Sequence, residues 1–115
     1  MLTSIPDLIK EIAPHTRRIT AEAAHQERQQ NDGLLIDVRE PEEHAAKPAQ
    51  NALNIPRGIV EMKMLAMEKD PQRPIYIHCA TAARATLAAE QLQRVGYQNV
   101  SVITCDMDTI MSVLT

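Results

Sequence analysis

The stretch IYIHCATAARA, residues 75–85, passes from an apolar run through a loop of small residues to an arginine. The run at 75–78 is short and apolar up to its last residue, which is typical of an inner strand of a parallel sheet covered by helices. Beyond the loop, apolar residues recur on one helical face until Gly96, a usual residue for the left-handed end of a helix. The stretch therefore predicts a buried strand, a tight loop and an amphipathic helix. The residues on the helical face are Ala85, Ala88, Leu92 and Val95.

Further segments have the pattern of strands. LLIDV at 34–38 is apolar on both faces except for Asp37 and predicts another inner strand. ALNI at 52–55 predicts a short strand and NVSVIT at 99–104 predicts the last one. A short extended segment, RIT, lies at 18–20.

Helices are predicted between these strands. Ser4 is suited to cap a helix over about 5–13, and Thr20 a second helix that stops at the turn signal of residues 31–33. EPEEH at 40–44 predicts a short helical turn that faces water.

GIVEMKMLAMEKD at 58–70 predicts one more helix. Strands that alternate with helices predict a three-layer α/β domain with a mainly parallel central sheet flanked by helices. We expect an N-terminal helix within residues 1–17 and the α/β domain over 18–115, together one compact unit. The apolar stripe expected on the helix at 58–70 is Ile59, Met62, Leu65 and Ala66.

Composition excludes several classes of function. The net charge of −3, the scattered Lys and Arg, and the presence of two Tyr with no Phe or Trp argue against nucleic-acid binding. No apolar stretch is long enough to cross a bilayer, and the start of the chain lacks the apolar centre of a signal peptide, so we expect a cytoplasmic protein without membrane contact. The Cys and His residues have no paired ligand spacing, and we expect neither a metal nor another cofactor.

Cys79 is the candidate reactive residue, because it lies where a parallel strand ends and a helix begins. In this position the backbone of residues 79–84 can curl so that its N–H groups bind an anion, and the helix N-terminus and Arg84 favour a thiolate. The alternative is that Cys79 is a small buried hydrophobic residue. His78, one residue earlier on the strand, points away from the loop and is interpreted as structural.

The length of the loop separates two kinds of anion chemistry. Cysteine phosphatases place five residues between the nucleophile and the arginine, whereas here four residues separate Cys79 from Arg84. The tighter loop favours a single terminal sulfur on Cys79, a persulfide, over a tetrahedral phosphate. A phosphatase or arsenate reductase remains an alternative that rests on His78-Cys79 and the downstream arginine alone. The four residues, which form the candidate substrate-binding loop, are Ala80, Thr81, Ala82 and Ala83.

Four motifs in this order and spacing resemble a single-domain rhodanese-like sulfurtransferase. They are LLIDVREPEEH, ALNIPRG, IYIHCATAAR and AAEQLQRVGYQNVSVI, and the resemblance covers roughly residues 18–111. It implies the rhodanese fold and a cycle in which Cys79 takes a sulfane sulfur from thiosulfate or a persulfide and passes it to a thiol acceptor. It also implies that Arg84 steadies the anionic donor. Asp37 and Arg39 match an acidic and basic pair whose role we interpret as structural support, and either Arg39 or the loop amides would be the partner of the Asp37 carboxylate.

The loop departs from the family pattern at three positions. Ala80 replaces a basic residue, Ala82 a glycine and Ala85 a serine. If the glycine position requires a positive φ, Ala82 costs about 1 kcal/mol. The loss of a basic residue leaves Arg84 as the charged donor, which favours a persulfide on a small molecule or a protein over doubly charged thiosulfate. The acceptor thiol would be glutathione or a thioredoxin-like protein.

Two alternatives follow from these departures. The altered loop could leave a catalytically weakened rhodanese-like module that serves binding or redox sensing. Cys105 follows the last strand, so we expect it near Cys79, as a possible resolving thiol that forms a disulfide with it. Asp106, in the same loop, would oppose a second anion near the site.

Overall fold

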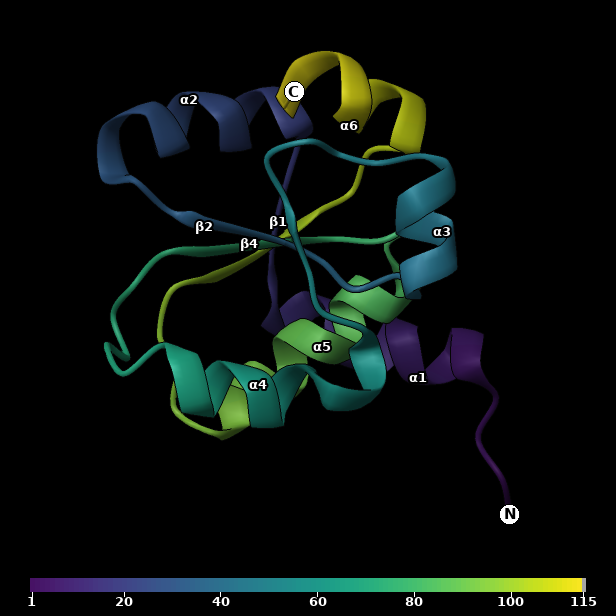
Figure 1. Ribbon diagram of the computed structural model, residues 1–115. Helices are drawn as coiled ribbons and strands as arrows, with labels where there is room; N and C mark the ends of the chain where they lie inside the picture. The colour runs from purple at the N-terminus through teal and green to yellow at the C-terminus, as the bar shows by residue number, and fades with distance from the viewer. Residues whose placement is uncertain (115) are drawn as a thin grey trace.

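A five-stranded parallel sheet forms the centre of the molecule in the computed structural model, which describes residues 1–114. Its order is β1-β5-β4-β2-β3, and every pair of neighbours runs parallel, so the predicted α/β architecture is confirmed (Figure 1). The segments predicted as inner strands, β4 and β2, lie inside the sheet. The strands are β1 Arg17–Ile19, β2 Leu34–Asp37, β3 Leu53–Asn54, β4 Ile75–His78 and β5 Val100–Ile103.

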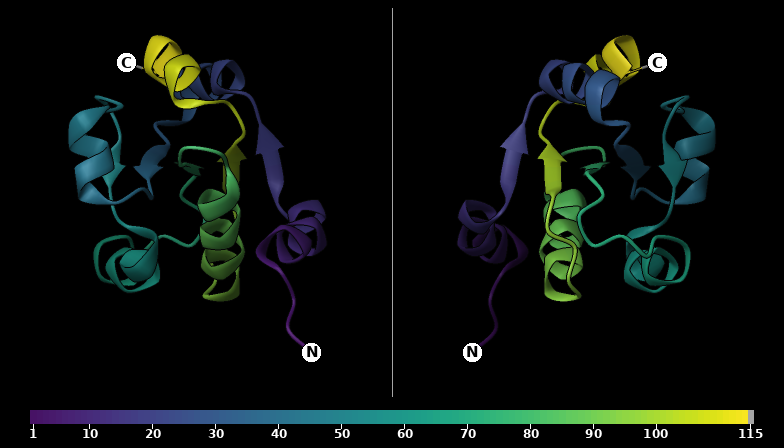
Figure 2. Two further views of the ribbon diagram at one scale, coloured as in Figure 1. Left: turned by 90° about the vertical axis from the view of Figure 1, so that its right-hand side faces the viewer. Right: turned by 90° about the vertical axis from the view of Figure 1, so that its left-hand side faces the viewer.

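Helices cover both faces of the sheet. α1, α4 and α5 lie on one face, α2 and α6 lie on the other, and α3 stands at the end of the sheet where the strands finish (Figures 1 and 2). The helices are α1 Ile5–Ile12, α2 Ala21–Asn31, α3 Pro41–Ala46, α4 Val60–Met67, α5 Ala83–Arg94 and α6 Met107–Leu114. Two 3₁₀ turns accompany them, η1 Ala13–His15 and η2 Arg57–Ile59.

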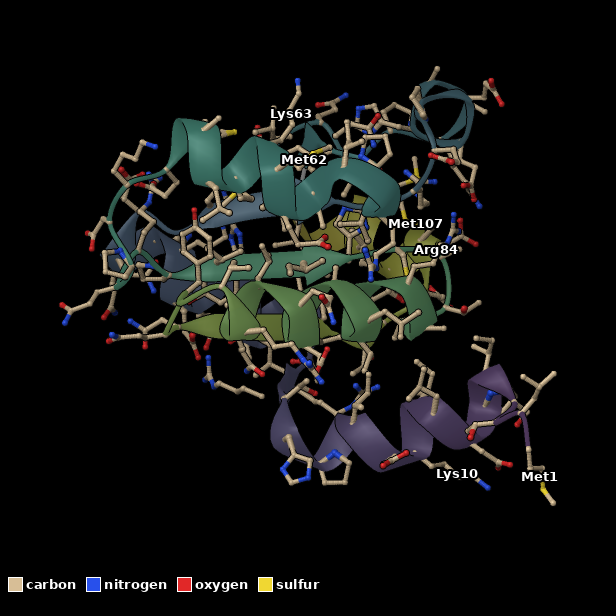
Figure 3. All side chains as sticks on the ribbon, turned by 90° about the horizontal axis from the view of Figure 1, so that it is seen from below. Met1, Lys10, Met62, Lys63, Arg84 and Met107 are labelled. Atoms are coloured by element: carbon tan, nitrogen blue, oxygen red, sulfur yellow. The ribbon has the colours of Figure 1, made fainter. Side chains whose placement is uncertain are left out.

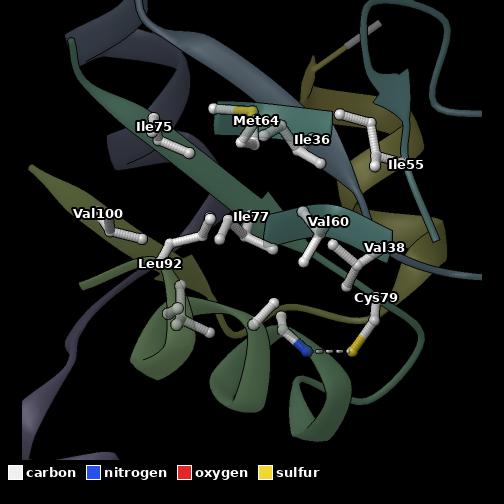
Figure 4. Close-up of a cluster of buried hydrophobic side chains, with 14 of the residues drawn as sticks. Ile36, Val38, Ile55, Val60, Met64, Ile75, Ile77, Cys79, Leu92 and Val100 are labelled. Carbon is white, nitrogen blue, oxygen red and sulfur yellow. Dashed lines mark hydrogen bonds between the residues drawn. The ribbon is translucent and has the colours of Figure 1, made fainter. Parts of the chain in front are cut away.

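The side chains of the sheet alternate between two apolar cores. Ile75 and Ile77 of β4 face α4 and α5, together with Ile36, Val60 and Leu92 (Figure 4). Tyr76 of β4 and Leu35 of β2 face α2 and α6. A strand that contributes to both cores has no polar face, which is why the strand segments are continuous apolar runs.

The helix ends follow the sequence closely. The Ser4 and Thr20 hydroxyls accept hydrogen bonds from the backbone N–H groups of Asp7 and Ala23, as the caps predicted. α2 ends at Asp32, whose backbone is left-handed with φ 54°. α6 has no counterpart in the sequence analysis, and its cap is Asp106, which accepts the N–H of Thr109.

The predicted stripe on α4 is wrong. Val60 and Met64 are the buried residues of this helix, while Met62 is 68% exposed and lies on its outer side (Figure 3). Ile59 and Leu65 are also exposed. Because α4 is short and carries apolar residues all round, its spacing does not define one stripe, and packing against α5 selects the face.

The described residues 1–114 contain no helix that combines the length and the apolar character needed to span a bilayer.

Gly33 provides a test of the packing beneath α2. A Cβ at this position would meet the ring of Tyr76, which is buried, whereas a Cβ at Gly58 would meet nothing within 4 Å. We expect Gly33→Ala to lower the free energy of unfolding by roughly 1–3 kcal/mol through overpacking. Gly58→Ala is the control and should change it by less than about 0.5 kcal/mol. Urea denaturation of both variants measures the difference, and equal midpoints would contradict the contact.

Candidate active site

Cys79 lies at the carboxyl end of β4, where the chain turns into α5. Its side chain is 1% exposed, and Sγ accepts a hydrogen bond of 3.3 Å from the backbone N–H of Ala85 in the first turn of α5 (Figure 4). The first N–H groups of a helix have no partner within the helix, so this end stabilises negative charge on sulfur. The donor to Sγ is therefore one residue beyond the loop 79–84 that we expected to supply it.

The loop turns sharply at Ala82. This residue has φ 71° and ψ −10°, so the position at which the family has glycine does adopt a positive φ in this chain. Its carbonyl oxygen accepts the backbone N–H of Thr86 at 2.9 Å and the Thr86 hydroxyl at 2.7 Å, which fixes the start of α5. Ala80 and Ala83 are half-buried and Thr81 is exposed, so the loop presents small side chains to solvent.

Asp37 and Arg39 form a buried ion pair beneath this end of the sheet. Arg39 donates from Nε and from a terminal nitrogen to the Asp37 carboxylate, at 2.8 Å for the shortest bond, and both side chains are at most 3% exposed. Burial alone would raise the pKa of Asp37, but hydrogen bonds from Arg39 and His44 outweigh it and hold the pKa below its usual value. The predicted pairing of Asp37 with Arg39 is confirmed.

Arg84 is paired with a residue that sequence reasoning missed. Its two terminal nitrogens lie 2.6 and 2.9 Å from the two carboxylate oxygens of Glu43 on α3. These hydrogen bonds lower the pKa of Glu43 to about 2. The prediction that EPEEH simply faces water does not hold for Glu43, which also accepts the N–H of Glu40 in a capping box. The three-residue spacing of Glu40 and Glu43 was the signal that this carboxylate is fixed.

Two histidines lie around Asp37. His44 had been assigned to solvent, yet its Nδ1 lies 2.8 Å from a carboxylate oxygen of Asp37. His78 is fully buried on the face of the sheet opposite Cys79, as strand alternation requires, and neither of its ring nitrogens has a hydrogen-bond partner within residues 1–114. Burial lowers the pKa of His78 to about 4, although Asp37 opposes the shift. His78 is therefore neutral near pH 7.

Cys105 does not lie with Cys79. Its Sγ accepts the backbone N–H of Ala21, at 3.2 Å, and packs against the core beneath α2 and α6, whereas Cys79 belongs to the core beneath α4 and α5. Both thiols are free. The structure shows no bond between the two thiols, and the helices that follow them, α5 and α6, leave the adjacent strands on opposite faces of the sheet (Figure 1).

The larger cavities lie away from Cys79. One of about 430 Å³ is lined by residues such as Arg17, Glu27 and Tyr76, and one of about 440 Å³ lies between α1 and α5. Within residues 1–114 no group of three His, Cys, Asp or Glu side chains is placed to hold a metal ion. The groups that the structure places at the site are the thiol, the N-terminus of α5 and the charged pairs beside it.

The parallel sheet and the thiol between β4 and α5 define an α/β domain that presents a cysteine at a helix N-terminus. The chain belongs to the rhodanese-like domain family, which it matches over residues 20–111. A sulfurtransferase of Allochromatium vinosum is 35% identical over 69 residues, which cover 60% of this chain and 63% of that protein. A thiosulfate sulfurtransferase of Escherichia coli is 31% identical over 65 residues, or 56% of this chain and 62% of that protein.

Solved structures agree with this assignment. The polysulfide-sulfur transferase of Wolinella succinogenes is 28% identical and superposes with a TM-score of 0.72 over 91% of this chain and 80% of that chain. The chain spans less than two thirds of the length of the curated relatives that it matches, with 63% and 58% covered for two of them and 44% for another.

Ala82 allows a test of the loop conformation. An alanine in the left-handed conformation costs roughly 1–2 kcal/mol, and glycine avoids this cost. The substitution also removes the buried methyl group of Ala82, which offsets about half of the stabilisation. We expect Ala82→Gly to leave the free energy of unfolding unchanged or to raise it by up to about 1 kcal/mol. Ala83→Gly, at the first helical position, is the matched control and should lower it by roughly 0.5–1 kcal/mol. Chemical denaturation distinguishes them, and equal losses would contradict the left-handed turn.

His78 predicts a pH dependence of stability. Its pKa lies below the unfolded value of 6.5, at about 4, so the unfolded chain binds the extra proton first. The contribution of His78 to the free energy of unfolding is therefore fully present above pH 6.5. It is lost between pH 6.5 and 4, by roughly 3 kcal/mol in total. In His78→Leu this contribution disappears, and the fall over that range becomes shallower by this amount. Thermal melts from pH 7 to 4 measure it, with the exposed His15→Leu as control; parallel profiles for wild type and His78→Leu would refute it.

Proposed function

We propose that the chain is a sulfurtransferase that carries a sulfane sulfur as a persulfide on Cys79. The observation that carries the proposal is the position of Cys79 Sγ, which accepts an N–H at the start of α5 beside the family's loop arginine. The sulfurtransferase names of its relatives support the same chemistry.

The cycle has two displacements. The Cys79 thiolate attacks the sulfane sulfur of the donor, a new S–S bond forms, and the old bond breaks with its electron pair on the leaving group, a thiolate or sulfite. An acceptor thiolate then attacks the terminal sulfur of the Cys79 persulfide. The S–S bond of the persulfide breaks, and the Cys79 thiolate is restored. No external oxidant or reductant is required.

The residues around Cys79 have distinct roles in this proposal. The N–H of Ala85 stabilises the thiolate that attacks and later leaves. The N–H groups of Ala83 and Arg84, also in the first turn, are available to the terminal sulfur. The loop residues Ala80 and Ala82 carry only methyl side chains, the smallest obstruction to an added atom that a residue with a Cβ can give. Arg84 provides a positive charge beside the loop, and its attraction to Cys79 contributes to the raised pKa of the guanidinium, after the larger effect of Glu43.

The donor and acceptor are part of the proposal. The Escherichia coli relative is named for thiosulfate and the Wolinella protein for polysulfide, so both classes of donor are candidates. We favour a persulfide on a small thiol or a protein. The acceptor would be a thiol such as glutathione or a thioredoxin-like protein, which a reducing cytoplasm supplies and in which two unpaired cysteines are ordinary.

A second candidate function is that of a rhodanese-like module that serves binding or redox sensing and does not catalyse sulfur transfer. Two observations favour it: Cys79 is 1% exposed, and the guanidinium of Arg84 is already occupied by Glu43. A module of this kind would keep the fold and the thiol without accepting sulfur from small donors.

Intact mass spectrometry tests the proposed function. After incubation with thiosulfate or glutathione hydropersulfide, the wild type should gain the mass of one sulfur atom, and cyanide should remove it. Cys79→Ser should gain nothing, because the acceptor atom is lost. Cys105→Ser is the matched control and should gain sulfur as the wild type does. If neither donor modifies the wild type, or if the adduct persists in Cys79→Ser, the carrier role of Cys79 is wrong.

A further inference from the structure

The positive charge beside Cys79 is already neutralised. Arg84 is the ionised side chain within residues 79–84, and both of its terminal nitrogens bind the Glu43 carboxylate, at 2.6 and 2.9 Å. A two-point guanidinium–carboxylate pair of this kind fixes orientation as well as charge. Glu43 therefore compensates the charge of the guanidinium and occupies two of its five N–H groups, so a second anion would meet a cation that is already paired.

Glu43 is itself held in place. One of its carboxylate oxygens accepts the N–H of Glu40 at 3.0 Å, and its backbone carbonyl oxygen accepts a hydrogen bond of 3.3 Å from Arg39. Arg39 in turn is fixed by the buried carboxylate of Asp37. The four side chains Asp37, Arg39, Glu43 and Arg84 alternate in sign and sum to zero charge. Removal of Glu43 from Arg84 would therefore also disturb the start of α3.

The surroundings add negative rather than positive charge. Glu40 and Glu42 are exposed on the first turn of α3, next to Glu43. A dianion such as thiosulfate is held best by a cation whose charge is not already compensated, and the carboxylates of Glu40 and Glu42 oppose its approach. A hydropersulfide, neutral or singly charged at its terminal sulfur, needs only the N–H groups at the start of α5.

We propose that Glu43 determines donor selectivity: by keeping Arg84 in a neutral pair, it makes the Cys79 site prefer hydropersulfides over doubly charged thiosulfate. This inference rests on the proposed sulfurtransferase function and assigns a substrate class to the same site. Glu43 is a positioning residue, since it acts through Arg84 and touches neither donor. The Arg84 hydrogen bonds keep the pKa of Glu43 near 2, so the pair stays charged throughout the neutral range.

Glu43→Gln isolates the charge. Glutamine still accepts the N–H of Glu40, because Gln serves in a capping box as Glu does, but it no longer neutralises Arg84. We expect kcat/KM with thiosulfate to rise by roughly fivefold or more, through a lower KM, as Arg84 becomes available to the dianion. With the hydropersulfide of 2-mercaptoethanol, whose organic part is uncharged, kcat/KM should change by less than about twofold.

Glu42→Gln is the matched control. It removes the same charge from the same turn of α3, one residue away, at an exposed side chain. Its ratio of kcat/KM values for the two donors should stay within about twofold of the wild type, since an exposed charge has only a weak effect at this distance. An equal shift in both variants would attribute selectivity to general surface charge and overturn the role of Glu43.

A double variant tests the path of the effect. In an Arg84→Ala background, Glu43→Gln should no longer change the donor ratio, because the cation that it frees is absent. This comparison also holds if Glu43→Gln alone lowers stability, since the ratio of two donors on one enzyme preparation is independent of the folded fraction. A shift that persists without Arg84 overturns the inference.

The outcomes separate the two proposals. Sulfur uptake from both donors, with a ratio that Glu43→Gln leaves unchanged, overturns the role of Glu43 and leaves the sulfurtransferase function in place. Uptake from neither donor, in the wild type and in Glu43→Gln alike, overturns the proposed function and this inference with it.

Discussion

The site is organised around the buried ion pair between Asp37 and Arg39. The carboxylate ends β2, and the guanidinium that it holds also donates to the backbone carbonyls of Glu43 and Lys47, at the two ends of α3. The Asn54 side chain donates to the carbonyls of Asp37 and Arg39 and so joins β3 to the same point. Loss of one partner would leave a buried charge without compensation, at a cost of roughly 3–5 kcal/mol. The position of α3, and through Glu43 that of Arg84, depends on this pair.

The electrostatics of the Cys79 loop follow from that arrangement. Long-range attraction is weak because each arginine near the site has a carboxylate partner, as Arg39 has Asp37 and Arg84 has Glu43. The attraction that remains acts at short range and comes from the N–H groups at the start of α5, one of which already donates to Sγ. The strength of such a hydrogen bond depends on the distance and angle between the N–H group and the sulfur atom, and not on the total charge of the donor molecule. Chemistry that adds one atom to a thiol therefore suits the site better than capture of a large anion.

Much of the fold could be predicted because the decisive signals are local. The apolar runs of β2 and β4 and the caps Ser4 and Thr20 follow from residue type and spacing. The left-handed turn at Ala82 could be considered only through the resemblance, because alanine itself disfavours a positive φ. The pairing of Asp37 with Arg39 followed from the cost of an isolated buried carboxylate. The face of α4 and the partner of Arg84 were missed for a common reason. Each is decided by contacts between segments far apart in the chain, α4 with α5 and α3 with α5, which one sequence does not specify.

The positions of Cys79 and Cys105 follow from the topology of the sheet. β4 and β5 are neighbours and end at the same edge, so their following loops start side by side. The chain then enters α5 on one face and α6 on the other, and each sulfur accepts an N–H from a different helix, Ala85 in α5 and Ala21 in α2. The two thiols therefore belong to different cores, and under the proposed function this separation favours an acceptor from outside the domain over a disulfide between Cys79 and Cys105.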